Sequence, residues 1–320
     1  MTKRQTHRHR TIAIIALSVT TLIWAGPPLF QKYLLPSYGN ATQNFYRYLI
    51  GFFVSVPFLL HKLRQRKVTL RWHHLSLMLL PSIPNVLHQY AGVECLQYLM
   101  PGFVSLFGKV GILFSFGLSY WMFKDERWLF KSGPFLVGFL LALGGSVGLV
   151  LLRPGTIDAS KFYKGIFWII ACGPLWAFYS VMIKKTTEEL GVYISFSLIS
   201  LWTSIGFLPL AIWEGKLSAI VDASWQADTV LIVSAILAIG LAHPLYYYSV
   251  RVLGVSVCQV VLLATPIPTI LSSAWLFHEV LTVPQTLFGT VLIIGGAMAC
   301  LARRPTAIDP AREIATSRDV

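Results

Sequence analysis

The strongest constraint on this chain is a series of long apolar segments that fill most of its length. Segments of about 17–25 apolar residues are long enough to cross a bilayer as helices. We identify ten, at residues 11–34, 42–61, 74–98, 100–123, 132–152, 164–184, 191–213, 228–250, 254–278 and 282–302. Only 12% of the 320 residues are charged, whereas soluble domains carry about 25%. The sequence therefore predicts an all-α integral membrane protein with ten transmembrane helices.

The basic residues between these segments predict the orientation. If the N-terminus is cytoplasmic, the cytoplasmic connections and tails hold 19 Lys and Arg residues, and the outer connections hold 5. Such an excess is typical of cytoplasmic loops. The net charge of +13 thus reports topology and contact with anionic lipid, and no nucleic-acid partner is needed to explain it. We expect a multi-pass protein with both termini in the cytoplasm, and the short loops favour a bacterial inner membrane.

The sequence carries none of the short motifs that mark enzymes, nucleotide sites or metal sites. It has no P-loop, no His-Glu-x-x-His, no nucleophile elbow and no Cys-x-x-Cys, and its four cysteines are scattered singly in apolar segments. We therefore expect no catalytic residues, no cofactor and no metal. ATP-driven transport by this chain alone is also not supported.

The two halves of the chain repeat each other. Residues 118–154 align with residues 271–305, and residues 22–32 align with residues 174–184. The alignment pairs Glu126 with Glu279, Gly144-Gly145 with Gly295-Gly296, and Trp24 with Trp176. Each half holds five helices, and because five is odd the second half enters the membrane upside down. We predict two inverted five-helix repeats, at residues 11–154 and 162–305, between cytoplasmic tails 1–10 and 306–320.

An inverted repeat is the architecture of alternating-access carriers, in which the solute site lies near the midplane between the halves. Three features resemble the drug/metabolite transporter superfamily, EamA type. They are the paired Trp-Ala dipeptides, Arg47 in NFYRYLIGFF, and the segments FKDERWLF and LFHEVLT, each of which precedes a Gly-Gly helix. In both copies the glycine of the family's usual Leu-Gly-Glu is replaced. The resemblance covers about residues 11–303 and implies transport of a small organic solute, with export favoured over uptake.

Two cations lie inside the predicted helices. Lys109 is the only charge between Glu94 and Lys124, and Arg47 lies early in the second segment. Ionisable residues inside a membrane usually face the bundle interior and pair with one another. One interpretation is that Lys109 and Arg47 present positive charge to a carboxylate or phosphate of the solute. The alternative is a structural Lys109–Glu94 pair, with Arg47 in a structural or gating role.

The prolines of the third and eighth segments suggest where a cavity lies. Asn85 follows Pro84 and His243 precedes Pro244, so polar side chains and helix breaks coincide there. His88 and His243 either relay protons for coupled transport or form hydrogen bonds within the core. Five aromatic residues are further candidates to line the cavity, with packing or an interfacial belt as the alternative for each: Trp24, Tyr90, Trp176, Tyr246 and Tyr247.

The helix ends carry two further predictions. Glu126 and Glu279 lie where a loop enters a helix, a position that suits helix capping or closure of a gate. Thr-Val-Pro-Gln at residues 282–285 has the pattern of a capping box. The glycines of the fifth and tenth segments predict close helix packing, either within the chain or in a homodimer.

We therefore interpret the chain as a secondary active transporter that exports a small polar or anionic metabolite. One alternative is a flippase or membrane enzyme that acts on a phosphorylated lipid. Another is a receptor or scaffold that transports nothing, and this alternative predicts no central cavity.

Overall fold

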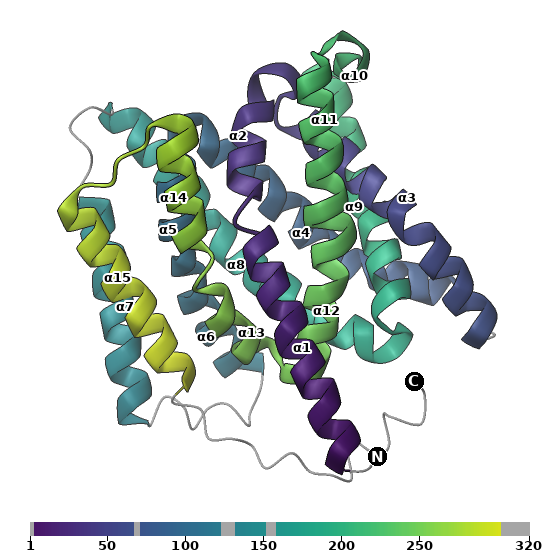
Figure 1. The fold of residues 1–320 in the computed structure, drawn as a ribbon, viewed down its shortest axis with the longest axis horizontal. Helices are drawn as coiled ribbons and strands as arrows, with labels where there is room; N and C mark the ends of the chain where they lie inside the picture. The colour runs from purple at the N-terminus through teal and green to yellow at the C-terminus, as the bar shows by residue number, and fades with distance from the viewer. Residues whose placement is uncertain (1–2, 67–70, 123–131, 152–157, 302–320) are drawn as a thin grey trace.

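The computed structural model describes residues 3–66, 71–122, 132–151 and 158–301, and this part of the chain is helical with no strand (Figure 1). Four helical stretches are long and apolar enough to cross a membrane by themselves: Arg8–Tyr38, Ala159–Leu190, Val192–Glu214 and Trp225–Leu253. Shorter apolar helices accompany them, among them Gly133–Leu149 and Val283–Met298. The predicted all-α membrane fold is confirmed.

Each predicted segment corresponds to one helix or to two or three helical elements stacked end to end. The first five are α1 (Lys3–Ile23) with α2 (Pro27–Tyr38), α3 (Ala41–Arg66), α4 (Trp72–Tyr98), α5 (Pro101–Phe107) with η1 (Gly108–Val110) and α6 (Gly111–Met122), and α7 (Gly133–Leu151). The second five are α8 (Ala159–Leu190), α9 (Val192–Glu214), α11 (Trp225–Ser234) with η3 (Ala235–Leu241) and α12 (Ala242–Leu253), α13 (Val255–Leu262) with α14 (Pro266–Phe277), and α15 (Val283–Leu301). The short α10 (Ala219–Asp222) lies between α9 and α11.

The contacts between helices follow the twofold relation expected of two inverted repeats. The second and seventh spans, α3 and α9, pack against each other, and so do the fifth and tenth, α7 and α15. The third span packs on the sixth (α4 on α8), and its counterpart, the eighth, packs on the first (α12 on α1). Figure 1 shows α7 with α15 on one side of the bundle and α3 with α9 on the other.

Four spans are interrupted near their middle. The first breaks at residues 24–26, before Pro27 and Pro28 open α2. The fourth contains the 3₁₀ turn η1, the eighth contains the π-helical segment η3, and the ninth breaks at residues 263–265. Irregular backbone at membrane depth is tolerated where protein or a water-filled cavity surrounds it.

The third span was expected to break at its prolines, and this prediction is wrong. Helix α4 runs without interruption through Pro81 and Pro84. Proline is tolerated inside a membrane helix when neighbouring helices support the freed backbone groups, and α4 packs along α8 and α9. The fourth span shows the opposite case, because its 3₁₀ turn contains no proline.

Glycines bring α7 and α15 into backbone contact. A Cβ atom built on Gly295 would lie 2.4 Å from the Ala142 nitrogen, and one built on Gly145 would lie 2.6 Å from the Leu292 nitrogen. Only glycine permits such an approach. Within the described chain these two glycines are therefore used between the repeats, whereas Gly144 is exposed and meets nothing within 4 Å. The expected packing within the chain is confirmed at Gly295 and is wrong for Gly144, whose neighbour Gly145 makes the contact instead.

We predict opposite effects of alanine at two adjacent positions of α7. Gly145→Ala should lower stability by about 1–3 kcal/mol, because its methyl group would force the two backbones apart. Gly144→Ala should be neutral or slightly stabilising, since alanine has the higher helix propensity and its methyl group finds open space. The apparent thermal unfolding midpoint in detergent measures both. Equal midpoints for the two variants would contradict the close contact.

Candidate functional site

A cavity of about 250 Å³ lies where the four interrupted spans meet. Each interruption contributes lining residues, as do the helices on either side of it, and α3, α4 and α8 complete the wall. The lining residues from the interruptions include Trp24, Gly108, Lys109, Ala238, Ile239, Leu263 and Thr265. The scaffold alternative predicted no central cavity, and the structure contradicts that prediction.

Two cations face this cavity without a carboxylate partner. Arg47 projects from α3 and is 1% exposed, and Lys109 lies on the 3₁₀ turn η1. Within the described ranges, neither comes within 4.0 Å of a carboxylate oxygen. Arg47 Nη1 reaches Asn44 Oδ1 at 3.5 Å, and its buried Nε has no partner. Arg47 is buried and Lys109 is partly buried. Because a cation taken out of water without a counter-ion is costly, these two side chains are the most unusual feature of the site.

The predicted structural pair between Lys109 and Glu94 is not formed. Glu94 lies near the C-terminal end of α4, where its Oε2 accepts hydrogen bonds from Asn40 Nδ2 at 2.9 Å and Gln97 Nε2 at 2.6 Å. These amides satisfy the carboxylate near the surface. Glu94 is therefore absent from the cavity wall, and the cavity keeps its positive charge.

The two predicted histidines both line the cavity. His243 Nδ1 lies 2.7 Å from the Ala238 carbonyl oxygen, which also accepts the indole N–H of Trp24 at 3.1 Å. Ala238 belongs to the π-helical segment, a distortion that often marks functional positions. His243 Nε2 and His88 Nδ1 are buried and have no partner among the described residues.

Trp24 and Trp176 form an aromatic wall, with ring centroids 5.6 Å apart and nearly perpendicular planes. Tyr246 and Tyr247 are fully buried behind this wall and do not line the cavity. Tyr246 stacks on Trp176 at 5.6 Å, and the Tyr247 hydroxyl lies 2.8 Å from that of Tyr179. The two tyrosines were predicted as lining residues, and they instead support the wall from the core.

Asn85 and Tyr90 also lie outside the cavity wall. Because α4 is unbroken, Asn85 turns toward α3 and α9, where Tyr48 donates to its Oδ1 at 3.3 Å and its Nδ2 donates to Thr203 at 3.1 Å. Tyr90 packs edge-on against Trp168 at 6.1 Å. Both predictions rested on the break at Pro84 that the structure lacks.

Several neutral polar residues of the wall were not predicted: Gln31, Gln89, Ser105, Gln259 and Thr265. Gln259 is the most informative, because its Oε1 accepts the indole N–H of Trp176 at 3.3 Å and its Nε2 is buried without a partner. The available signal was a glutamine within an apolar segment, a few residues before the break at 263–265.

Glu279 caps a helix of the other repeat. Its carboxylate accepts hydrogen bonds from the backbone nitrogens of Gly102 and Phe103, at 2.7 and 2.8 Å, and from Ser273 Oγ at 2.5 Å. The capped helix is α5, whereas the sequence suggested α15. His278 precedes Glu279 at φ +53°, the left-handed conformation that glycine favours. Glu126, its predicted counterpart, lies outside the described residues.

Two further caps appear at helix starts. The predicted box at residues 282–285 is confirmed, since Thr282 and Gln285 exchange backbone-to-side-chain hydrogen bonds at 3.0 and 3.4 Å. Glu214, which was not predicted, accepts the backbone N–H groups of Asn40 and Thr42 at the start of α3. Gly39 precedes this cap at φ +70°, and a Cβ there would lie 2.7 Å from the Glu214 carboxylate.

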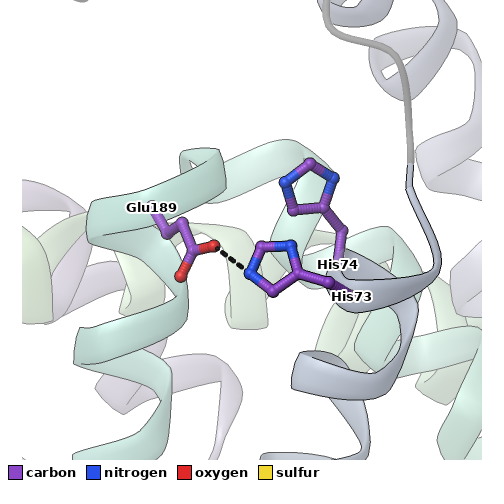
Figure 2. Close-up of side chains that lie close together, drawn as sticks. All are labelled: His73, His74 and Glu189. Atoms are coloured by element: carbon purple, nitrogen blue, oxygen red, sulfur yellow. Dashed lines mark ion pairs between the residues drawn. The ribbon is translucent and has the colours of Figure 1, made fainter.

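A separate polar cluster ties the start of α4 to the end of α8. Figure 2 shows His73, whose Nε2 lies 3.1 Å from Glu189 Oε1, with His74 beside them. Each of the three residues offers one metal-ligand atom, and these atoms all lie within 4.8 Å of one another. The cluster therefore has the donor atoms that a metal site would need. His74 Nδ1, however, accepts the Arg71 backbone N–H at 3.2 Å as part of the α4 cap. The cluster is explained by these structural contacts.

The EamA-like transporter family matches residues 11–151 and 163–301, which is most of the chain. The chain belongs to this family. An uncharacterized transporter of Archaeoglobus fulgidus is 24% identical over 303 residues, covering 91% of this chain and 97% of that protein. An uncharacterized transporter of Haemophilus influenzae is 20% identical over 195 residues, 61% of this chain and 64% of that protein.

A solved crystal structure superposes with a TM-score of 0.58 at 16% identity, over 94% of this chain and 98% of that one, and shows the same fold. Family membership and the apolar helices make this protein a multi-pass membrane transporter. The same membership favours transport over catalysis.

We predict that Glu279→Gln lowers stability by about 1–2 kcal/mol, because an amide has one acceptor oxygen and cannot satisfy both N–H groups of α5 together with Ser273. Thermal unfolding in detergent measures the change. Glu188→Gln on α8 is the matched control, since Glu188 is exposed. A loss of equal size in both variants would show that capping is not the cause.

Proposed function

We propose that this transporter exports a small organic anion by alternating access and that Arg47 and Lys109 hold the anionic group in the central cavity. The observation that carries the proposal is the pair of cations in the wall, neither of which has a described carboxylate within 4.0 Å. An anionic solute would supply the missing counter-charge. Lysine offers a compact point charge and arginine a planar set of donors, and both suit a carboxylate or phosphate.

The walls and volume of the cavity limit the solute further. Ligand pockets for drug-sized molecules usually measure about 300–1,000 Å³, and this cavity of about 250 Å³ lies below that range. Trp24, Trp176 and aliphatic residues such as Ile169 and Leu262 form much of its wall. We therefore propose a small solute that combines an apolar body with its anionic group.

The capping contact of Glu279 gives alternating access a defined element to release. Glu279 follows α14 in the second repeat, and the N–H groups that it binds open α5 in the first. Opening this side of the cavity would require the contact to separate. We propose that Glu279 acts as a gate at the outer face. This assignment places both termini in the cytoplasm, as the distribution of basic residues favours, and the short loops favour a bacterial inner membrane.

The positive cavity can be tested without knowing the solute, because Cys172 lies in its wall. In a variant that keeps Cys172 as its only cysteine, an anionic methanethiosulfonate reagent should react faster than a cationic one. Both rates are normalised to an uncharged reagent. Lys109→Met should reduce the ratio of anionic to cationic rates on the order of tenfold, because one nearby unit charge is removed.

Lys185→Met is the matched control, since Lys185 is exposed near the end of the same helix as Cys172 and should leave the ratio unchanged. Equal normalised rates for both reagents in the native background would overturn the proposal. So would a ratio that Lys109→Met does not alter.

A further inference from the structure

We infer that the transported anion carries a hydrogen-bond donor, such as a hydroxyl group, and no ammonium group, and that His243 is the residue that recognises this donor. The inference rests on the proposed function and deepens it. It follows from the polar atoms of wall residues that have no partner in the described part of the chain.

The hydrogen bond to Ala238 fixes the tautomer of His243. A carbonyl oxygen can only accept, so His243 Nδ1, 2.7 Å away, must be the donor. The neutral imidazole then carries a bare lone pair on Nε2, which is buried and has no partner among the described residues, and His243 itself lines the cavity. The indole N–H of Trp24 approaches the same oxygen and fixes the position of the acceptor.

The surroundings of His243 favour the neutral ring. Trp24, Tyr48, Phe196 and Tyr247 pack around it, with ring centroids 5.1 to 6.4 Å away. The other ionisable groups of the wall are Arg47, Lys109, His88 and Cys95 with Cys172, and among the described residues no carboxylate lines the cavity. A third positive charge beside two cations is electrostatically unfavourable, so Nε2 serves as an acceptor.

Of the other unpartnered side-chain atoms of the wall, Gln259 Nε2 and Arg47 Nε are donors, and His88 Nδ1 can donate or accept because its tautomer is not fixed. Gln259 has its Oε1 on the indole N–H of Trp176, which can only donate, so the orientation of the amide is fixed and Nε2 points its N–H groups away from that bond. Arg47 Nε is likewise a buried donor without a partner. The site thus offers several donors and two cations to an anion, and one fixed acceptor, His243 Nε2, to a donor group.

This pattern separates three classes of small acid. An amino acid would place its ammonium group beside Arg47 and Lys109 with no carboxylate to receive it. An unsubstituted acid would leave His243 Nε2 buried and unpaired, which weakens binding. A hydroxylated carboxylate or phosphate monoester satisfies both the cations and the acceptor. Sites built around a hydroxyl group discriminate strongly against analogues that lack it.

The experiment measures how well solutes protect Cys172 from the anionic thiol reagent in the single-cysteine variant. The probes are matched sets of several sizes, each with a 2-hydroxy acid, the parent acid and the 2-amino acid, together with glycerol phosphate and propyl phosphate. We expect the hydroxylated member of at least one set to protect at about tenfold lower concentration than its parent. The amino acids should protect least.

Two substitutions of His243 distinguish recognition from packing. His243→Asn can still donate to the Ala238 carbonyl but has no acceptor at the position of Nε2, so the preference for the hydroxylated solute should vanish. His243→Gln can place its amide oxygen near that position and should retain a preference. Both variants are checked for folding by gel filtration and tryptophan fluorescence.

The outcomes separate this inference from the proposed function. If parent and hydroxylated acids protect equally in the native protein, or amino acids protect best, the inference is overturned and the anion site stands. If the preference survives in His243→Asn, the donor is recognised elsewhere and the role of His243 is overturned. If no anion protects Cys172, the proposed anion site itself fails.

Discussion

A peptide group within the hydrocarbon core has no water to bond, so any unpaired backbone N–H or C=O there is costly. This constraint decides where the transporter can depart from helical geometry. All four interrupted spans depart from it at one place, the central cavity. The Ala238 carbonyl shows how the exposed backbone is used, because Trp24 and His243 both bind to it. The position of the site therefore follows from the hydrogen-bonding needs of the chain.

The charges of the protein are arranged by the same logic. Glu214 and Glu279 are satisfied by backbone N–H groups at the starts of α3 and α5, and Glu94 by neighbouring amides. In the part of the chain that the structure describes, Arg47 and Lys109 have no carboxylate partner at the cavity. Carboxylates satisfied at helix ends, together with cavity cations that lack one, suit a solute that brings negative charge.

The positions of the spans could be predicted because bilayer thickness fixes the length of an apolar segment. Lys109 and Arg47 could be assigned to the interior because a charge within such a segment has few other places to lie. The interruptions were harder to predict. Pro81 and Pro84 left α4 intact, whereas Gly108–Val110 formed a 3₁₀ turn without proline. Whether a helix breaks depends on which neighbours support it, and the sequence of one segment does not contain that information.

The same dependence on neighbours explains the errors in the site. Asn85 and Tyr90 were placed in the cavity through a break that α4 lacks, and Gln259 was overlooked because a single amide in an apolar segment carries little signal. The contact between α7 and α15 is the opposite case. There the backbone of one repeat touches the backbone of the other near the pseudo-twofold axis, so each copy limits the size of the side chains in its twin. A mutation in one half would be tolerated only if the other half made room for it. The Gly-Gly pairs that align between the halves, Gly144-Gly145 and Gly295-Gly296, each supply one glycine to this contact.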